Sequence, residues 1–254
     1  MKELKRVPPN KGIEKEYKRK LDKLVKAMSA SVMYWVLADF GNRSAWQMAN
    51  AIRKRVKQWD KIFGDKAERI ALWFVKSVRK QTETGMALAF KDAGYKMKRQ
   101  TPEEVIKAVA YENIELIKSV PEKYFIGIKE VALLSLMYGW SKDKLSQELE
   151  KRNGIVLRRV KNIASDQTHK TTELIKRGIS LNNGIRYAKW VYTWRSETPR
   201  ENHIMMDGLV YDMEKGALTP EGDEIIFPGQ KINCKCDFRP VIPEYGDNLT
   251  GGKF

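Results

Sequence analysis

Cysteine and histidine are scarce in this chain of 254 residues, which has only two of each. Two cysteines cannot build the framework of several disulfides that small secreted domains use. A disulfide between Cys234 and Cys236 would also be strained, because near neighbours on an extended strand project in parallel. The sequence therefore predicts reduced thiols and a protein made in the cytoplasm.

Long hydrophobic runs are missing as well. The apolar stretch at 28–38 (MSASVMYWVLA) is too short to span a bilayer, and the first 26 residues are crowded with charge. We therefore expect no membrane anchor and no signal peptide, and we interpret the stretch as a buried helix. Apolar residues still make up 42% of the chain, with seven Trp, ten Tyr and eight Phe, which allows a sizeable core.

The common catalytic signatures are absent too. The chain has no Walker A sequence, no GxGxxG, no HExxH and no paired-carboxylate pattern. The absence of these motifs argues against an enzyme of the nucleotide-binding or metalloprotease classes.

Positive charge is the strongest global feature, with a formal net charge of +16. Residues 1–100 hold 25 Lys and Arg against 10 Asp and Glu, whereas the remainder is almost neutral. This asymmetry indicates contact with a polyanion, although charge runs are often no more than solvated helix faces. No helix-turn-helix, RRM, KH or zinc-finger spacing is present, so we expect non-specific contact with the backbone of double-stranded DNA. The candidate nucleic-acid-binding residues are Arg53, Lys54, Arg55, Lys57, Lys61, Lys96, Lys98 and Arg99.

Apolar spacings of three and four residues predict helices over most of the first 180 residues. One helix is expected from Ile13 to about Ala38, and a second is expected to end at Gly64 before a third begins. Thr101 and Pro102 predict a helix start, and Pro121 is expected to begin another helix. A short helix capped by Ser141 and a long one from about Ile155 to Ile179 complete the expected set.

The pattern changes after Asn182-Asn183-Gly184. The alternating aromatic segment at 187–194 favours a strand, and short strands fit at 209–212, 224–227 and 237–241 between dense turn residues. The predicted fold class is α+β, a long mostly α-helical N-terminal region followed by a small C-terminal β-rich module. The predicted segments are a basic extended arm at 1–12, a helical region at 13–154 (basic up to about residue 100), a module at 155–245 and a flexible tail at 246–254.

The stretch PGQKINCKC (228–236) holds both cysteines, and His203 lies about thirty residues upstream. Two thiolates and an imidazole are zinc ligands, and Asp207 is a possible fourth. The spacing matches no standard zinc finger, so we favour a metal-free cluster with buried thiols and no cofactor, and keep a structural zinc as the alternative. A Cys–His nucleophile is a third interpretation. His169, on a predicted helix, is expected to be a surface or capping residue.

The order of motifs in the last hundred residues resembles the Mu F-like, or phage head-morphogenesis, family of minor head proteins. IASDQTHK (163–170) lies on a predicted helix, an aromatic strand follows, then PRENHIMMDG (199–208) and PGQKINCKC. The resemblance covers about residues 155–242. The matching positions are Trp190, Arg200, His203, Asp207, Gly208, Pro228, Gly229, Asn233, Cys234 and Cys236.

The resemblance implies a structural protein of a tailed bacteriophage virion, placed inside the head near the portal and acting in head assembly and in DNA packaging or ejection. Its implied partners are the portal protein, the major capsid protein or scaffold, and double-stranded DNA. Two alternatives stay open: an enzyme whose toxin-like or nucleotide-processing module uses Arg200 and His203, and a DNA-binding protein that is absent from the particle.

Overall fold

The structure is a computed structural model that describes residues 1–194 and 199–243. The flexible tail expected at 246–254 lies outside the described residues, as does the end of the expected module at 244–245. No helix in the described part of the chain combines the length and the apolar character that a bilayer crossing demands.

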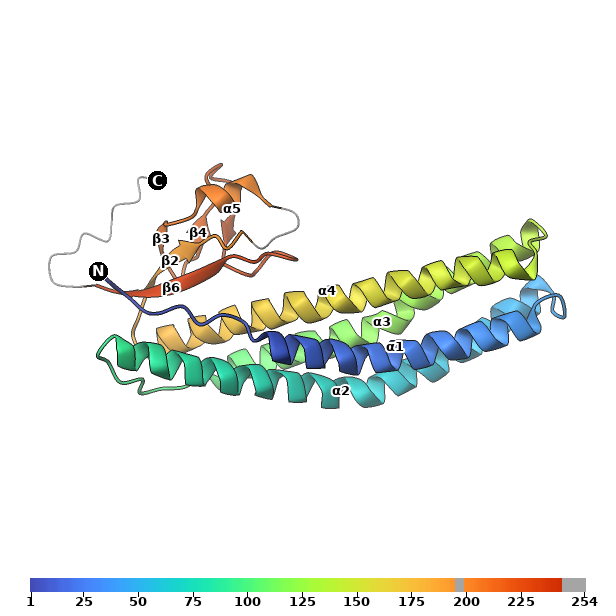
Figure 1. Ribbon diagram of the computed structural model, residues 1–254, viewed down its shortest axis with the longest axis horizontal. Helices are drawn as coiled ribbons and strands as arrows, with labels where there is room; N and C mark the ends of the chain where they lie inside the picture. The colour runs from blue at the N-terminus through green and yellow to red at the C-terminus, as the bar shows by residue number, and fades with distance from the viewer. Residues whose placement is uncertain (195–198, 244–254) are drawn as a thin grey trace. The chain divides into compact units, whose positions relative to one another are not determined.

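The α+β fold class is confirmed, since four long helices precede a small antiparallel sheet (Figure 1). The helices are α1 (Lys11–Asp39), α2 (Ala45–Asp92), α3 (Glu103–Met137), α4 (Lys142–Asn182) and the short α5 (Glu201–Met205). The strands are β1 (Lys2–Glu3), β2 (Tyr187–Val191), β3 (Val210–Asp212), β4 (Ala217–Leu218), β5 (Ile225–Ile226) and β6 (Asp237–Ile242).

The chain forms two compact units, and each is built from separate stretches of sequence. One, which we call the helical unit, contains residues 14–73 and 110–164. The other, the sheet unit, contains residues 1–13, 74–109 and 165–254. The segment boundaries expected from the sequence stay a prediction, because they follow chain order and these units do not.

Three helix boundaries expected from the sequence are wrong. Gly64 lies inside α2, where its backbone stays helical and an added Cβ would meet no atom within 4 Å. Pro121 lies inside α3 and starts no helix. The two helices expected after Ser141 are one, α4. The expected start after Thr101-Pro102 is confirmed, because α3 begins at Glu103.

The helical unit packs segments of four helices on an apolar core that includes Val25, Phe63 and Ile128. Polar contacts fix their pairing. The hydroxyl of Tyr17 on α1 donates to Asn113 on α3 across 3.0 Å in a buried position. The hydroxyl of Tyr124 on α3 donates to Asn153 on α4 across 2.7 Å.

The sheet of the sheet unit has the strand order β1-β6-β2-β3, and every neighbouring pair is antiparallel. Lys2 and Glu3 pair with Ile242 and Val241, so the two ends of the described chain lie side by side in the sheet (Figure 1). The expected N-terminal arm is therefore extended but also anchored, with Leu4 and Val7 buried. A separate small ladder joins β4 to β5.

Candidate functional site

The three residues that the sequence offered as metal ligands lie together. His203 is on α5, and both cysteines are in the segment that leads into β6. The Nδ1 atom of His203 is 3.4 Å from the Sγ of Cys234 and 3.4 Å from the Sγ of Cys236. Each of the three residues is only 2% exposed. We call this group the thiol–imidazole cluster.

Local backbone geometry explains how the cluster forms. Asn233 has φ of +60°, a left-handed conformation that Asn tolerates better than most residues, and the Cys234 N–H donates to the carbonyl of Lys231. This turn directs the chain so that both thiols face α5. The ring of Trp190 on β2 packs edge-on against His203, with centroids 5.7 Å apart, and holds the imidazole in place.

The two thiols differ electrostatically although they are two residues apart. A hydrogen bond from Cys236 lowers the pKa of Cys234 well below that of an ordinary thiol, and contact with His203 lowers it further against the effect of burial. The same hydrogen bond, followed by burial, raises the pKa of Cys236.

The other motif residues around α5 hold the chain around this cluster. Arg200 donates from Nη2 to the carbonyl of Ile232 across 3.0 Å. Asp207 is exposed and lies outside the cluster, and its Oδ1 accepts a hydrogen bond from the Tyr192 N–H at 2.8 Å. Gly208, with φ of +85°, donates its N–H to the carbonyl of Trp190. Arg200 and His203 thus both contact the segment at 232–236 that carries the cysteines.

Helix α4 packs against the segment that carries the cysteines. His169 is buried, and its Nε2 lies 2.7 Å from the carbonyl oxygen of Cys236, so the expectation of a surface histidine is wrong. Burial lowers the pKa of His169 to about 4. The Oδ1 of Asp166 accepts from the Asn233 N–H at 2.5 Å. Gly229 lies close to α4, since a Cβ added there would be 3.0 Å from the Glu173 Cγ.

A buried ionic cluster lies beside this contact, and sequence reasoning missed it. The ammonium of Lys176 contacts both carboxylate oxygens of Glu173, at 3.1 and 2.9 Å, and also the carboxylate of Asp237. Arg6 of the N-terminal arm contacts the same Asp237. Burial raises the pKa of Glu173, whereas Lys176 and Arg6 hold the pKa of Asp237 below its ordinary range despite burial. The spacing of His169, Glu173 and Lys176, which places them on one helix face, was the available signal.

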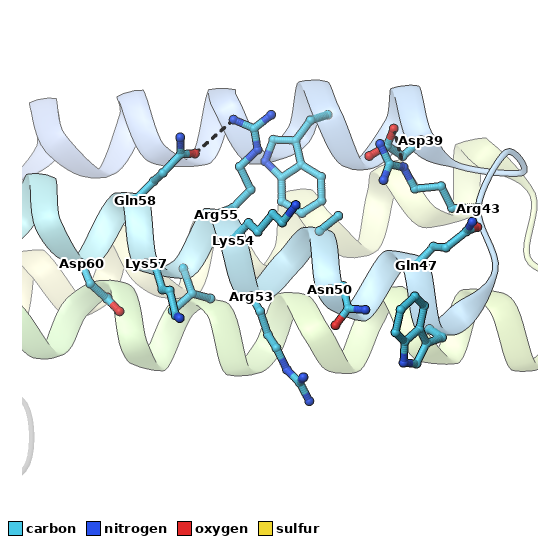
Figure 2. A pocket seen from close by; sticks show the side chains of 14 residues that line it. Asp39, Arg43, Gln47, Asn50, Arg53, Lys54, Arg55, Lys57, Gln58 and Asp60 are labelled. Carbon is cyan, nitrogen blue, oxygen red and sulfur yellow. Dashed lines mark hydrogen bonds and ion pairs between the residues drawn. The ribbon is translucent and has the colours of Figure 1, made fainter.

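A second candidate site is a hollow of about 1170 Å³ on the helical unit, lined by residues of α1, α2 and the turn between them (Figure 2). We call it the basic groove. Arg53, Lys54 and Lys57 line it without an ion-pair or hydrogen-bond partner among the described residues. Two further cations are engaged: Arg43 pairs with Asp39, and Arg55 donates to Gln58 and lies 5.7 Å over the Trp35 ring.

The same unit has another hollow, of about 730 Å³, lined by five cations and two tryptophans. These residues are Arg19, Lys20, Lys23, Lys66, Arg69, Trp59 and Trp73. The ammonium of Lys20 lies 4.5 Å from the centroid of the Trp73 ring. Cations next to exposed aromatic faces are a common composition of nucleic-acid-binding surfaces.

The other expected DNA-binding residues lie elsewhere. Lys61 is exposed on α2, whereas Lys96, Lys98 and Arg99 follow α2 in the sheet unit. The side chain of Asn183 holds this loop, because its Oδ1 accepts from the backbone N–H groups of Lys98 and Arg99. The two groups of cations that the sequence suggested therefore belong to different units.

The protein thus belongs to the class of helical proteins with a small antiparallel sheet, and the thiol–imidazole cluster is buried beside that sheet. Residues 127–239 match the family model described as Phage Mu protein F like protein. This match confirms the resemblance to the Mu F-like family that the motifs indicated, over a region that is less than half of the chain. The matched region begins earlier than the motifs indicated and includes about the last third of α3.

One curated relative matches over most of this chain. It is an uncharacterised protein of Haemophilus influenzae, 24% identical over 256 residues, and the match covers 94% of this chain and 55% of the relative. The chain therefore spans about half the length of the curated relative it matches. No solved structure matches the chain significantly.

Proposed function

We propose that this protein is a minor head protein of a tailed phage, which acts inside the head near the portal and helps head assembly and DNA packaging or delivery. The observation that carries the proposal is the match of residues 127–239 to the family model described as Phage Mu protein F like protein. Several motif residues support it by position, since Arg200 contacts the carbonyl of Ile232 and His203 lies against both cysteines.

Particle composition tests this role directly. Mass spectrometry of purified, DNA-filled heads should find the protein at low copy number relative to the major capsid protein. Its absence from filled heads, together with its presence in infected cells, would contradict a virion role and favour a protein that acts only before assembly. Abundance in proheads followed by loss from mature heads would instead indicate a scaffold.

Non-specific DNA contact is the second part of the proposal, and the basic groove is its main support. The helical unit holds 24 Lys and Arg against 14 Asp and Glu, an excess of ten positive charges. Arg53, Lys54 and Lys57 have no ion-pair or hydrogen-bond partner in the part of the chain that the structure describes, and they line the basic groove where phosphates would bind (Figure 2). Each neutralised phosphate releases counterions, so binding should weaken steeply with salt.

The test measures binding of the whole chain to unrelated duplexes of equal length. Affinity should be similar for all of them and should fall by a factor on the order of 10³ between 50 and 200 mM salt if six phosphates are engaged. The triple change Arg53→Glu, Lys54→Glu and Lys57→Glu should weaken binding and flatten the salt dependence. The matched variant reverses Lys96, Lys98 and Arg99 in the sheet unit. If that variant loses more affinity, the basic groove is not the principal DNA contact.

Portal contact is the third part of the proposal, because exposed apolar side chains are the anchors that protein interfaces use. Tyr34 is 80% exposed, Trp46 75% and Met137 73%, all in the helical unit. The loops that join α1 to α2 and α3 to α4 lie at the same end of this unit (Figure 1). Changing Trp46 and Met137 to Ser should reduce co-purification with the portal protein, while reversal of Lys96, Lys98 and Arg99 should not. Unchanged co-purification with the portal protein would contradict a contact through Trp46 and Met137.

A further inference from the structure

The thiol–imidazole cluster has the dimensions of a metal site. A tetrahedral zinc ion about 2.3 Å from sulfur and about 2.0 Å from nitrogen places those two atoms about 3.5 Å apart. The observed separations of His203 Nδ1 from the two Sγ atoms are both 3.4 Å, and all three atoms lie within 4.8 Å of one another. The two nitrogen–sulfur separations therefore match those around a single tetrahedral zinc ion.

Hydrogen bonding alone gives a weaker account of this arrangement. A thiol is a poor donor and a poor acceptor, so bonds between two thiols and one imidazole contribute little. Cys234, Cys236 and His203 nevertheless converge on a common point in a buried site. Two thiolates and a neutral imidazole are the donor set that zinc prefers among the common biological cations, and its charge would balance both sulfurs.

Neighbouring side chains hold the candidate zinc ligands in position. Trp190 packs against the imidazole, and His169 on α4 engages the carbonyl of Cys236, so both a ring and a ligand backbone are fixed from outside. Regular secondary structure contributes little here, because the described residues 228–236 contain neither helix nor strand. A metal would join this irregular segment to α5.

We propose that His203 Nδ1, Cys234 Sγ and Cys236 Sγ bind one zinc ion that stabilises the sheet unit. The sequence alone favoured a metal-free cluster because its spacing matches no standard zinc finger; the convergence of the three side chains points the other way. Asp207 is held away by its hydrogen bond from the Tyr192 N–H, so these three side chains are the protein ligands assigned to the ion. Each of the three is 2% exposed, and we assign the ion a role in stability because it would tie the irregular segment of the cysteines to α5.

The first experiment uses the unmodified full chain, purified under reducing conditions without chelator. Atomic emission should find about one zinc per chain. Removal of zinc with a strong chelator should lower the melting temperature of the sheet unit by an amount on the order of 10 °C, for a free zinc concentration about a thousand times the Kd, and zinc should restore it. Cobalt(II) added to the apo chain should give the visible absorption of tetrahedral thiolate coordination.

The second experiment compares matched variants. Cys234→Ser, Cys236→Ser and His203→Gln should each reduce bound zinc to less than about a tenth of the wild-type amount, since structural sites need their full ligand set. Asp207→Asn keeps the oxygen that accepts from Tyr192 and should retain full zinc. Far-UV circular dichroism separates loss of metal from loss of the whole fold.

Three results would overturn the proposal. The first is a wild-type chain with much less than one zinc and a melting temperature that neither chelator nor zinc alters. The second is a protein two hydrogens lighter in mass, which would identify a disulfide in place of a metal. The third is full zinc retention in Cys234→Ser and Cys236→Ser. None of these measurements requires a phage particle, so failure here leaves the proposed head role standing.

Discussion

The buried ionic cluster gives the sharpest stability prediction, through the change Lys176→Met. Lys176 is 1% exposed and lies between the carboxylates of Glu173 and Asp237, which are 2% and 0% exposed. The change leaves two buried carboxyl groups, of which Asp237 keeps its contact with Arg6. Removing one partner of a buried ion pair costs about 3–5 kcal/mol, since the remaining charge stays desolvated. At about 2–4 °C per kcal/mol, the melting temperature should fall by roughly 6–20 °C.

Differential scanning calorimetry of the full chain measures this change, and hydrogen exchange of β2 and β6 amides assigns it to the sheet unit. Two variants calibrate the result. Lys189→Met removes a partly exposed pair with Glu3 in the same sheet and should cost about 1 kcal/mol or less. Adding Glu173→Leu to Lys176→Met removes the uncompensated carboxyl and should recover part of the loss. If Lys176→Met costs no more than Lys189→Met, the cluster is not a stabilising contact.

Three further predictions use small changes of packing, each measured by denaturant unfolding of the full chain. Gly85→Ala should destabilise the protein, because the added Cβ would lie 2.6 Å from Val7 Cγ1, and Val7→Ala in the same chain should relieve the clash. Gly64→Ala is the control: its Cβ meets no atom within 4 Å, so the free energy of unfolding should rise by up to about 1 kcal/mol. Equal effects of the two glycine changes would contradict the packing of the arm on α2. Gly229→Ala should cost about 1–3 kcal/mol, because φ is +76° and Glu173 lies beside it; a neutral result would be at odds with that tight contact. Tyr17→Phe should cost about 1 kcal/mol through one lost buried hydrogen bond, and no loss would argue against the α1–α3 pairing.

The sequence predicted the α+β class and most elements, because apolar periodicity and the Thr101-Pro102 start signal are local properties that the fold preserves. Its errors at Gly64 and Pro121 share a cause. Both residues weaken an isolated helix, but packing of a long helix outweighs a local cost of about 1–3 kcal/mol. Local signals therefore located helices well and their ends poorly.

The candidate site, too, was predicted only in part. The motif brought His203, Cys234 and Cys236 under consideration together, and the structure places them within contact of one another. Glu173 and Lys176 were overlooked, because charged residues at helical spacing usually mark a solvated face. Only the contact of α4 with Gly229 and Asp237 makes that face an interior one, and no local pattern reveals which segment covers a helix.

The pairing of β1 with β6 has a consequence for the order of events during synthesis. Lys2 and Glu3 are made before their partners in β6, which follow more than 230 residues later. At roughly 5–20 residues per second, about 12–48 s separate the two. During this interval the arm, with Leu4 and Val7, has no sheet to join, whereas the helical unit is already complete in sequence at residue 164. The helical unit is thus expected to fold before the sheet unit, and β1 can pair only after β6 has been made.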